Sequence, residues 1–305
     1  MKKIFKNIFL IVFIIFNIFF PRDILRENIT IYQSNKNLVS QTKLIVSYIN
    51  AQDKKTLTNE VPILAYHNIA PWPNHPTELF KSLTVRVDEF NAQMLYLFNN
   101  GYTPITLKEL DLIWNKRKQM PLKPIILTFD DGYSNVFRYA FPTLGKYKFK
   151  FVIFPITKYL FIDTSMYLSQ EKIKEMLKSG LSEIGSHTRD HVSLKKVPNS
   201  IAYFEICQSK NDIKKFLNYD ATSFCYPFGE YNGFTIETLR KCKYSMATTE
   251  KYGFASQTQN HLLLNRIRID GRESLSSFIA KLSNHKSNNV LLFQNAGVLL
   301  YPCAD

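Results

Sequence analysis

The sequence predicts a parallel α/β domain, and three observations support this fold class. Short apolar runs of strand length alternate along the chain with longer segments in which apolar residues recur at helical spacing. The run 125–129 contains only apolar or β-branched residues, as expected for a strand buried on both faces in a parallel sheet or barrel. The chain has 305 residues, and α/β barrels of about 250 residues commonly form one domain.

The elements can be placed in chain order from Val61, where we expect the folded domain to begin. Residues 61–66 are predicted to form a strand that runs directly into His67. Two helices follow, the first with Asp88 as its N-cap and the second with a capping box at Thr106 and Glu109. Later strands are expected at 125–129, 151–155, 223–226, 244–248 and 262–269, and later helices at 169–180, 199–218, 234–243 and 273–282.

The N-terminal part of the chain differs in character from the rest. Residues 1–22 open with lysines and are then apolar from 8 to 20, apart from Asn17, which is the pattern of a signal peptide or signal anchor. Because no small residues form a cleavage site after the apolar stretch, we favour an uncleaved anchor with a cytoplasmic N-terminus, with a cleaved signal peptide as the alternative. We expect a polar stalk at 23–60 and an exported domain at 61–305.

The charge and the cysteines narrow the functional classes. The formal net charge is +14, but the basic residues are spread along the chain and form no stripe with stacking aromatics, so no nucleic-acid partner is expected. The positive charge fits residence near an anionic membrane or cell-wall surface. The four cysteines form no C-x-x-C pattern. We expect Cys207 and Cys242 to fill the core, and the sequence does not assign a disulfide.

Two acids after the apolar run 125–129 form the first candidate site. Asp130 and Asp131 are poor strand formers, so the strand is expected to end there, and Gly132 allows the chain to turn. The carboxyl ends of strands carry the chemistry in α/β barrels. A solvated turn is the alternative interpretation of this stretch.

Two histidines form the second candidate site. His187 and His191 are four residues apart, which would place both side chains on one face of a helical turn, close enough to share a cation. A single His-x-x-x-His pattern is a weak signal. Together with the acid pair, and each after an apolar strand-like run, the histidines predict a metal site.

Two stretches of the sequence are Thr-Phe-Asp-Asp-Gly at 128–132 and Ser-His-Thr-Arg-Asp-His at 186–191. They resemble two motifs of the polysaccharide deacetylases, the family with the NodB homology domain (carbohydrate esterase family 4). The resemblance spans roughly residues 61–284 and implies a distorted (β/α)7 barrel. It also implies a divalent metal ion, with zinc favoured and cobalt, nickel or iron compatible. By this resemblance the metal ligands are Asp131, His187 and His191, and the catalytic base is Asp130.

The chain departs from the family pattern at two later motifs. The third motif, usually Arg-x-Pro-Tyr, is Cys-Tyr-Pro-Phe-Gly at 225–229, so the arginine that orients the base is missing. The late Leu-x-His motif has Gln294 in place of its histidine. The sequence does not choose among the arginines that would replace the missing one, which are Arg86, Arg266 and Arg268.

Two features of the chain are similar to one branch of this family: the Tyr-Pro-aromatic-Gly variant and Tyr66-His67 on an early strand. That branch deacetylates poly-β-1,6-N-acetylglucosamine, the intercellular-adhesion polysaccharide of biofilms. In that branch the early histidine is the general acid, which implies this role for His67. The backbone N–H of Phe228 is a candidate oxyanion donor. The alternatives are a histidine that only caps a strand and a phenylalanine that only packs in the core.

We therefore expect an exported, monomeric, metal-dependent N-deacetylase of an extracellular N-acetylglucosamine polysaccharide, acting at the membrane or cell-wall surface. The alternatives are a peptidoglycan N-acetylglucosamine deacetylase and a catalytically silent polysaccharide-binding module. Trp72 and Tyr133 flank expected strand ends, where they would stack on sugar rings or pack in the core. Asp190 would orient a ligand histidine or remain a solvated loop acid.

Overall fold

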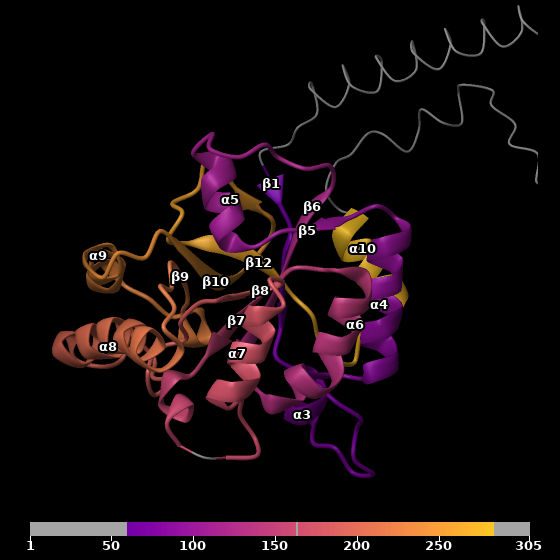
Figure 1. The fold of residues 1–305 in the computed structure, drawn as a ribbon, viewed down its shortest axis with the longest axis horizontal. Coiled ribbons are helices and arrows are strands. Elements are labelled where there is room, and N and C mark those ends of the chain that lie inside the picture. The colour runs from indigo at the N-terminus through magenta and orange to yellow at the C-terminus, as the bar shows by residue number, and fades with distance from the viewer. Residues whose placement is uncertain (1–59, 163, 284–305) are drawn as a thin grey trace, which may run out of the picture. The chain divides into compact units, whose positions relative to one another are not determined.

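The computed structural model describes residues 60–162 and 164–283 (Figure 1). Seven parallel strands form the centre in the order β8-β7-β6-β2-β12-β10-β9, and the short strand β5 (Thr103–Pro104) pairs with the start of β6. The seven are β2 (Ile63–Tyr66), β6 (Pro124–Asp131), β7 (Phe151–Pro155), β8 (Ser182–Ile184), β9 (Ser223–Cys225), β10 (Met246–Tyr252) and β12 (Leu264–Arg268).

The predicted membrane segment at 1–22, the stalk up to residue 59 and Gln294 lie outside the described residues. Val61, where we expect the domain to begin, lies in β1 (Glu60–Val61), which pairs with β11 (Ala255–Ser256). Within the described part of the chain, no helix is both long enough and apolar enough to cross a membrane.

The central sheet curves until its two edge strands meet. Ser186, just after β8, forms a parallel bridge with Phe224 of β9. The Ser186 amide donates to the Ser223 carbonyl at 3.0 Å, and the Cys225 amide donates to the Ser186 carbonyl at 2.8 Å. The predicted distorted seven-stranded barrel is therefore confirmed, and these few bonds, rather than a full strand ladder, join its edges.

Helices surround the strands, with α4, α6 and α10 on one side and α8 and α9 on the other (Figure 1). The Thr106 capping box is present as predicted, and Ser169 caps the helix that begins at Gln170. The prediction for Asp88 was wrong: Arg86 holds the N-cap position, because the chain enters the helix directly after β4 (Thr84–Val85), and Asp88 lies in the first turn. The helices are α3 (Glu78–Leu83), α4 (Val87–Asn99), α5 (Leu107–Trp114), α6 (Phe141–Tyr147), α7 (Gln170–Lys178), α8 (Asn199–Leu217), α9 (Gly233–Lys241) and α10 (Leu275–Ser283).

The alternation of side chains along β6 positions the acid pair. Ile126 belongs to an apolar cluster inside the barrel, and Leu127 to the cluster between strands and helices. Asp130, four residues after Ile126, therefore points into the barrel. The strand ends at the acid pair, as expected, and includes both acids, since Asp130 and Asp131 pair with the end of β7.

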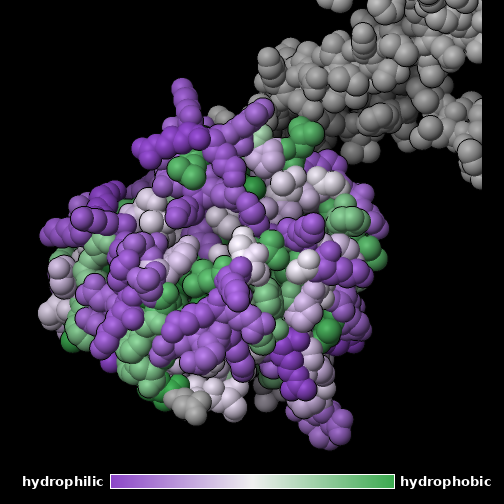
Figure 2. All heavy atoms as spheres, in the orientation of Figure 1, coloured by the Kyte–Doolittle hydropathy of each residue, from purple (hydrophilic) through white to green (hydrophobic). Residues whose placement is uncertain are grey.

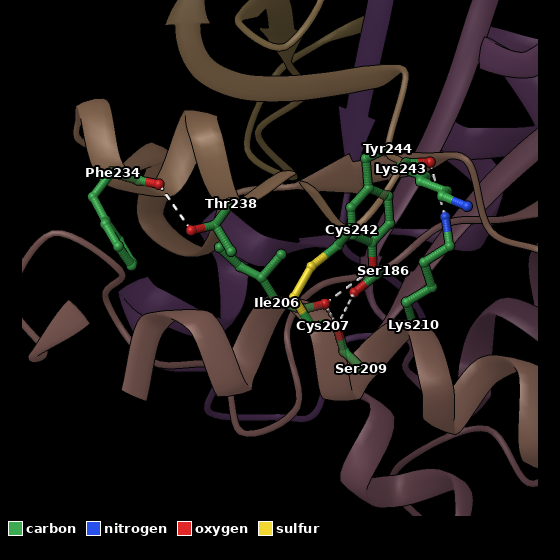
Figure 3. The surroundings of a disulfide bond; sticks show 10 residues. All are labelled: Ser186, Ile206, Cys207, Ser209, Lys210, Phe234, Thr238, Cys242, Lys243 and Tyr244. Atoms are coloured by element: carbon green, nitrogen blue, oxygen red, sulfur yellow. Dashed lines mark hydrogen bonds between the residues drawn. A yellow bond between two sulfur atoms is a disulfide. The ribbon is translucent and has the colours of Figure 1, made fainter. Parts of the chain in front are cut away.

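A disulfide joins Cys207 of α8 to Cys242, the residue after α9 (Figure 3). The expectation that both cysteines only fill the core was therefore wrong. The two sulfurs meet because α8 packs against α9, a contact that a sequence separation of 35 residues does not reveal. Next to the disulfide, the Ser209 hydroxyl lies 2.7 Å from the Ser186 hydroxyl at the closure of the barrel.

Removing this disulfide should lower the free energy of unfolding by about 4 kcal/mol, because a closed loop of this length restricts the unfolded chain. The measurement is urea unfolding of a variant carrying Cys207→Ser and Cys242→Ser. Reducing the disulfide of the wild-type protein should lower the free energy of unfolding by the same amount. The variant Cys225→Ser, which keeps the disulfide, should lose as much stability on reduction as the wild type. A double variant as stable as the oxidised wild type would contradict the expectation.

The view in Figure 2 shows mainly hydrophilic side chains, with hydrophobic ones interspersed among them. Several large apolar side chains are nevertheless exposed near the ends of the strands, among them Phe161, Met166 and Phe228. Isolated apolar side chains of this kind are normal on a protein surface.

Candidate metal and catalytic site

The residues predicted for the site lie at or just after the ends of four barrel strands and gather at one end of the barrel. Because all seven strands are parallel, their carboxyl ends meet at the same rim, which carries the active site in α/β barrels. The positions are His67 after β2, Asp130 and Asp131 at the end of β6, His187 and His191 after β8, and Phe228 after β9.

Three of these side chains converge into a set that could hold a metal ion. Asp131 Oδ1 lies 3.5 Å from His187 Nε2 and 3.4 Å from His191 Nε2, and one ligand atom from each residue lies within 4.8 Å of the others. Ligands about 2.0–2.1 Å from a tetrahedral zinc ion would be separated by about 3.4 Å. The carboxylate and imidazole donors fit zinc, and also cobalt, nickel or iron.

Backbone contacts orient the two histidines. The Cys225 carbonyl lies 2.8 Å from His187 Nδ1, which leaves Nε2 directed towards Asp131. The predicted helical turn was wrong: residues 187–191 form a loop in which Thr188 and His191 have φ values of 62° and 59°. The Thr188 hydroxyl accepts the His191 amide at 3.0 Å and holds this turn. A left-handed loop therefore brings the rings together.

Arg266 on β12 supplies the guanidinium that the third motif lacks. Its Nη1 donates to Asp130 Oδ1 at 2.8 Å and its Nη2 to Asp130 Oδ2 at 2.7 Å. Arg86 instead pairs with Asp88 and Glu89 on the surface. Of the three candidate arginines, Arg266 is therefore the one that pairs with Asp130. The two residues meet because β12 and β6 both flank β2 and direct these side chains into the barrel.

The environment of Asp130 keeps this carboxyl group ionised. Burial by itself would raise its pKa, but the charge and hydrogen bonds of Arg266 outweigh burial and hold the pKa of Asp130 below its ordinary value. The Cys225 thiol, whose pKa is raised by burial, donates to Asp130 Oδ2 at 3.4 Å. The cysteine therefore lies beside the Asp130 carboxylate without supplying a charge.

His67 and Phe228 complete the rim. The Nδ1 atom of His67 is buried and has no hydrogen-bond partner among the described residues. Phe228 has φ 59° and a side chain that is 61% exposed, so it does not pack in the core. Its ring contacts His191 edge-on, with ring centroids 4.7 Å apart.

Comparison with known proteins identifies the family. A family model described as polysaccharide deacetylase matches residues 117–247. The chain is 35% identical over 227 residues to YxkH of Bacillus subtilis (strain 168), named as a polysaccharide deacetylase, and the match covers 74% of this chain and 77% of that protein. The chain belongs to the polysaccharide deacetylase family. The predicted membership is confirmed, and so is the enzyme class, a hydrolase of carbon–nitrogen bonds.

Two further comparisons concern substrate and fold. The chain is 25% identical over 291 residues to the poly-beta-1,6-N-acetyl-D-glucosamine N-deacetylase of Escherichia coli O157:H7, covering 80% of this chain and 42% of that protein. This deacetylase thus spans less than half the length of that relative. The solved structure of the Streptococcus pyogenes deacetylase PplD in complex with acetate matches with a TM-score of 0.68 and 27% identity, covering 73% of this chain and 98% of that one.

A carboxylate on α8 holds the histidine loop of the deacetylase, and sequence patterns did not identify it. Glu205 Oε2 accepts the backbone N–H groups of Arg189 at 3.0 Å and of Asp190 at 2.8 Å. The side chain of Asp190 faces Arg189 and Lys158. These contacts favour the interpretation of Asp190 as a solvated acid of the loop. Glu205, rather than Asp190, is the carboxylate that positions the histidine loop.

Replacing Glu205 by glutamine should weaken metal binding by about 10–100-fold, a size found for groups that support metal ligands. The carbonyl oxygen of glutamine can still accept both N–H groups, but it carries no charge, so the two hydrogen bonds that hold the loop become weaker. Competition with a chelating indicator measures the affinity. Glu237→Gln, which changes an exposed acid on α9, should leave the affinity unchanged, and an unchanged affinity in Glu205→Gln would remove this role.

Three tyrosines form a stack beside Asp131, of which the sequence indicated only Tyr133. The rings of Tyr133 and Tyr167 have centroids 5.5 Å apart, and those of Tyr167 and Tyr159 are 3.7 Å apart and nearly parallel. Burial, followed by the charge of Asp131 and a hydrogen bond to it, raises the pKa of Tyr133 to about 12. The Tyr133 hydroxyl therefore stays neutral and supports the carboxylate of the metal set.

Proposed function

We propose that the protein is an exported, metal-dependent deacetylase of poly-β-1,6-N-acetyl-D-glucosamine. The observation that carries this proposal is the convergence of Asp131, His187 and His191 beside an Asp130 carboxylate paired with Arg266. A binding module has no need of an ionised base next to a metal set, so this arrangement counts against a silent module.

The chain's residues divide the work of amide hydrolysis between them. Asp131, His187 and His191 would hold the ion, which supplies a water of lowered pKa and polarises the acetyl oxygen. Asp130, kept ionised by Arg266, would accept the proton of the attacking water. The Phe228 backbone N–H would stabilise the oxyanion, and protonated His67 would give its proton to the departing amine.

Two features favour the β-1,6-linked substrate over peptidoglycan. His67 lies at the catalytic rim, and a cysteine replaces the third-motif arginine, a combination that resembles the branch acting on poly-β-1,6-N-acetylglucosamine. The Escherichia coli relative named for that activity supports the same choice. Partial deacetylation would place positive amines on the polymer, which would retain it at the cell surface and support intercellular adhesion.

The proposed location is the outer face of the membrane or the cell wall. The apolar segment within residues 1–22 would anchor the chain, residues 23–60 would form the stalk and residues 61–305 the catalytic domain. The disulfide between Cys207 and Cys242 supports export, because such bonds persist in oxidising compartments.

The deciding experiment measures acetate release by the purified protein from a β-1,6-linked N-acetylglucosamine pentamer, with the metal content determined in parallel. We expect release that a chelator abolishes and that added zinc restores. A β-1,4-linked pentamer is the matched control substrate. Release from the β-1,4 pentamer alone would transfer the assignment to peptidoglycan-type substrates, and no release from either by the metal-loaded protein would favour a binding role.

A further inference from the structure

The disulfide between Cys207 and Cys242 encloses a part of the chain that completes the barrel. Residues 207–242, which we call the closed segment, contain the second half of α8, the strand β9, the turn with Phe228 and most of α9 with its end at Lys241. The strand β9 is one of the two edge strands that meet to close the sheet. The disulfide therefore links the two ends of the segment at which the barrel is joined.

The closed segment contacts both histidines of the proposed metal set. The Cys225 carbonyl, in β9, lies 2.8 Å from His187 Nδ1. The Phe228 ring lies against His191, with ring centroids 4.7 Å apart. Movement of β9 away from β8 would remove the contact that directs His187 Nε2 towards Asp131.

One face of α8 supports the loop that carries these histidines. Glu205, Ser209 and Asp212 recur at helical spacing, and all three are buried. Glu205 accepts two backbone N–H groups of the loop. The Ser209 hydroxyl lies 2.7 Å from the hydroxyl of Ser186, which directly precedes the first histidine. Asp212 Oδ2 accepts the Thr157 hydroxyl at 2.9 Å. The position of α8 therefore sets the position of the loop.

The disulfide fixes α8 to the chain that follows α9 (Figure 3). Beside it, the Lys210 ammonium group donates to the Lys243 carbonyl at 2.9 Å. The Tyr244 hydroxyl donates to the Ile206 carbonyl at 3.3 Å. Each of these hydrogen bonds contributes little net free energy, because water forms equivalent bonds when the contact opens. The disulfide is the covalent bond of this group and does not open in thermal fluctuations.

The junction between β8 and β9 is the part of the barrel that we expect to open most readily. Proteins open locally in contiguous units, and units held by few hydrogen bonds open at the lowest free energy. While the disulfide is intact, an opened closed segment remains a loop with joined ends and gains little conformational entropy. After reduction its ends separate, and the entropy of the open state rises. The disulfide therefore opposes this opening in particular.

We propose that the disulfide between Cys207 and Cys242 controls metal retention. The oxidised protein holds its ion, and the reduced protein releases it through opening of the barrel between β8 and β9. The ion is the one of the proposed function, on which the proposal therefore rests. A chain in a reducing compartment would release its metal readily, whereas the exported, oxidised chain would keep it.

Reduction requires a dithiol, and the disulfide is accessible to it because both cysteines are partly exposed. One thiolate of the dithiol attacks a sulfur of the disulfide, which breaks the bond and forms a mixed disulfide. The second thiol then releases the protein sulfur. The dithiol loses two electrons and two protons and becomes a cyclic disulfide, and the protein gains two cysteine thiols. Cys225 is buried and remains a thiol throughout.

The first test measures the rate at which zinc leaves the loaded protein for an excess of a chelating indicator. The variant with Cys207→Ser and Cys242→Ser should release zinc at least about tenfold faster than the oxidised wild type. Reduced wild type, freed of dithiol by gel filtration under nitrogen, should release it equally fast. Cys225→Ser, which keeps the disulfide, should respond to reduction in the same way. Equal rates in the oxidised wild type and the double variant would overturn the proposal.

A matched control separates metal retention from overall stability. Phe278 is fully buried in α10, on the side of the barrel away from α8 and α9 (Figure 1). Phe278→Ala should lower the free energy of unfolding about as much as loss of the disulfide does. It lies outside the closed segment, so its rate of zinc release should remain that of the wild type. Release as fast as in the double cysteine variant would overturn the proposal.

A second test follows amide hydrogen exchange in the metal-free protein. Reduction should accelerate exchange about tenfold or more in β9 and in residues 186–191, and leave β2 and β6 unchanged. Equal acceleration throughout the barrel, or loss of the far-ultraviolet circular dichroism on reduction, would overturn the proposal, because the disulfide would then support the whole domain.

Neither test uses a saccharide, so failure of the β-1,6 assignment and failure of the redox control are distinguishable. A protein that hydrolyses neither pentamer but loses zinc faster on reduction supports the redox control alone. A protein that hydrolyses the β-1,6 pentamer, with release and exchange unaffected by reduction, retains the proposed function and overturns the redox control.

Discussion

Replacing Asp130 by asparagine should reduce acetate release by about 10²–10⁴-fold, the usual contribution of a general base. Asparagine has nearly the same shape, but it carries no charge and does not accept the proton of the attacking water. The residue is 1% exposed and lies against Arg266, so bulk water does not replace it. The measurement is kcat on the β-1,6 pentamer, with metal content determined by mass spectrometry.

The metal content of single-residue variants distinguishes the proposed general base from the proposed metal ligands. Asp130→Asn should retain the ion, whereas Asp131→Asn should lose both the ion and the activity. Asp190→Asn, which changes an acid in the histidine loop paired with Arg189 and Lys158, should retain both. Wild-type kcat in Asp130→Asn would assign the proton transfer to another group.

Replacing Arg266 by methionine should lower the free energy of unfolding by about 3–5 kcal/mol, because it leaves the Asp130 carboxylate buried without its partner. Arg266 and Asp130 are each 1% exposed, so solvent does not compensate for the lost pair. Urea unfolding of the metal-free proteins at pH 7 measures the loss. Arg268→Met is the matched control: it changes an exposed arginine of the same strand, and its effect should stay within about 0.5 kcal/mol.

The pH dependence of this loss of unfolding free energy shows whether the unpaired Asp130 carboxylate causes it. In the wild type Arg266 holds the pKa of Asp130 below its ordinary value, so the contribution of this carboxylate is present above about pH 4 and is lost as the pH falls. In Arg266→Met the largest influence that lowers this pKa is gone, so burial, which raises it, outweighs the smaller effects of His67 and His187 and the pKa of Asp130 rises. The contribution is then present below about pH 4 and is lost as the pH rises.

The difference in stability between Arg266→Met and the wild type should therefore narrow as the pH falls from 7 towards 4. A difference that stays constant over this range would mean that lost packing, rather than an unpaired carboxylate, destabilises the variant. Adding Asp130→Asn to Arg266→Met should recover part of the stability at pH 7, because the uncompensated charge is then removed.

The fold was accessible from sequence because its signals are local. The run 125–129 has only apolar or β-branched residues, which is typical of a strand covered on both faces, and β6 is such a strand. The capping box at Thr106 and Glu109 depends on contacts within one helical turn, and it is present as predicted. The N-cap of α4 was misplaced because β4 ends immediately before it, and this junction left Asp88 inside the first turn.

The geometry of the histidines shows where local patterns were insufficient. A spacing of four residues fits a helical turn, but the loop 187–191 adopts left-handed conformations at Thr188 and His191. Glu205, on the helix α8 that follows the loop, accepts two backbone N–H groups of this loop. The sequence indicated that the histidines lie together and did not indicate how they are held.

The sequence by itself determined the family and the parallel α/β barrel, because strand pattern and motif are properties of short segments. For the same reason it placed Asp130, Asp131, His187 and His191 at or after the ends of barrel strands. Only the tertiary structure decided that Arg266 replaces the third-motif arginine and that Cys207 bonds to Cys242. Both contacts join residues far apart in the chain. Strand order and helix packing bring such residues together, and no local pattern specifies those contacts.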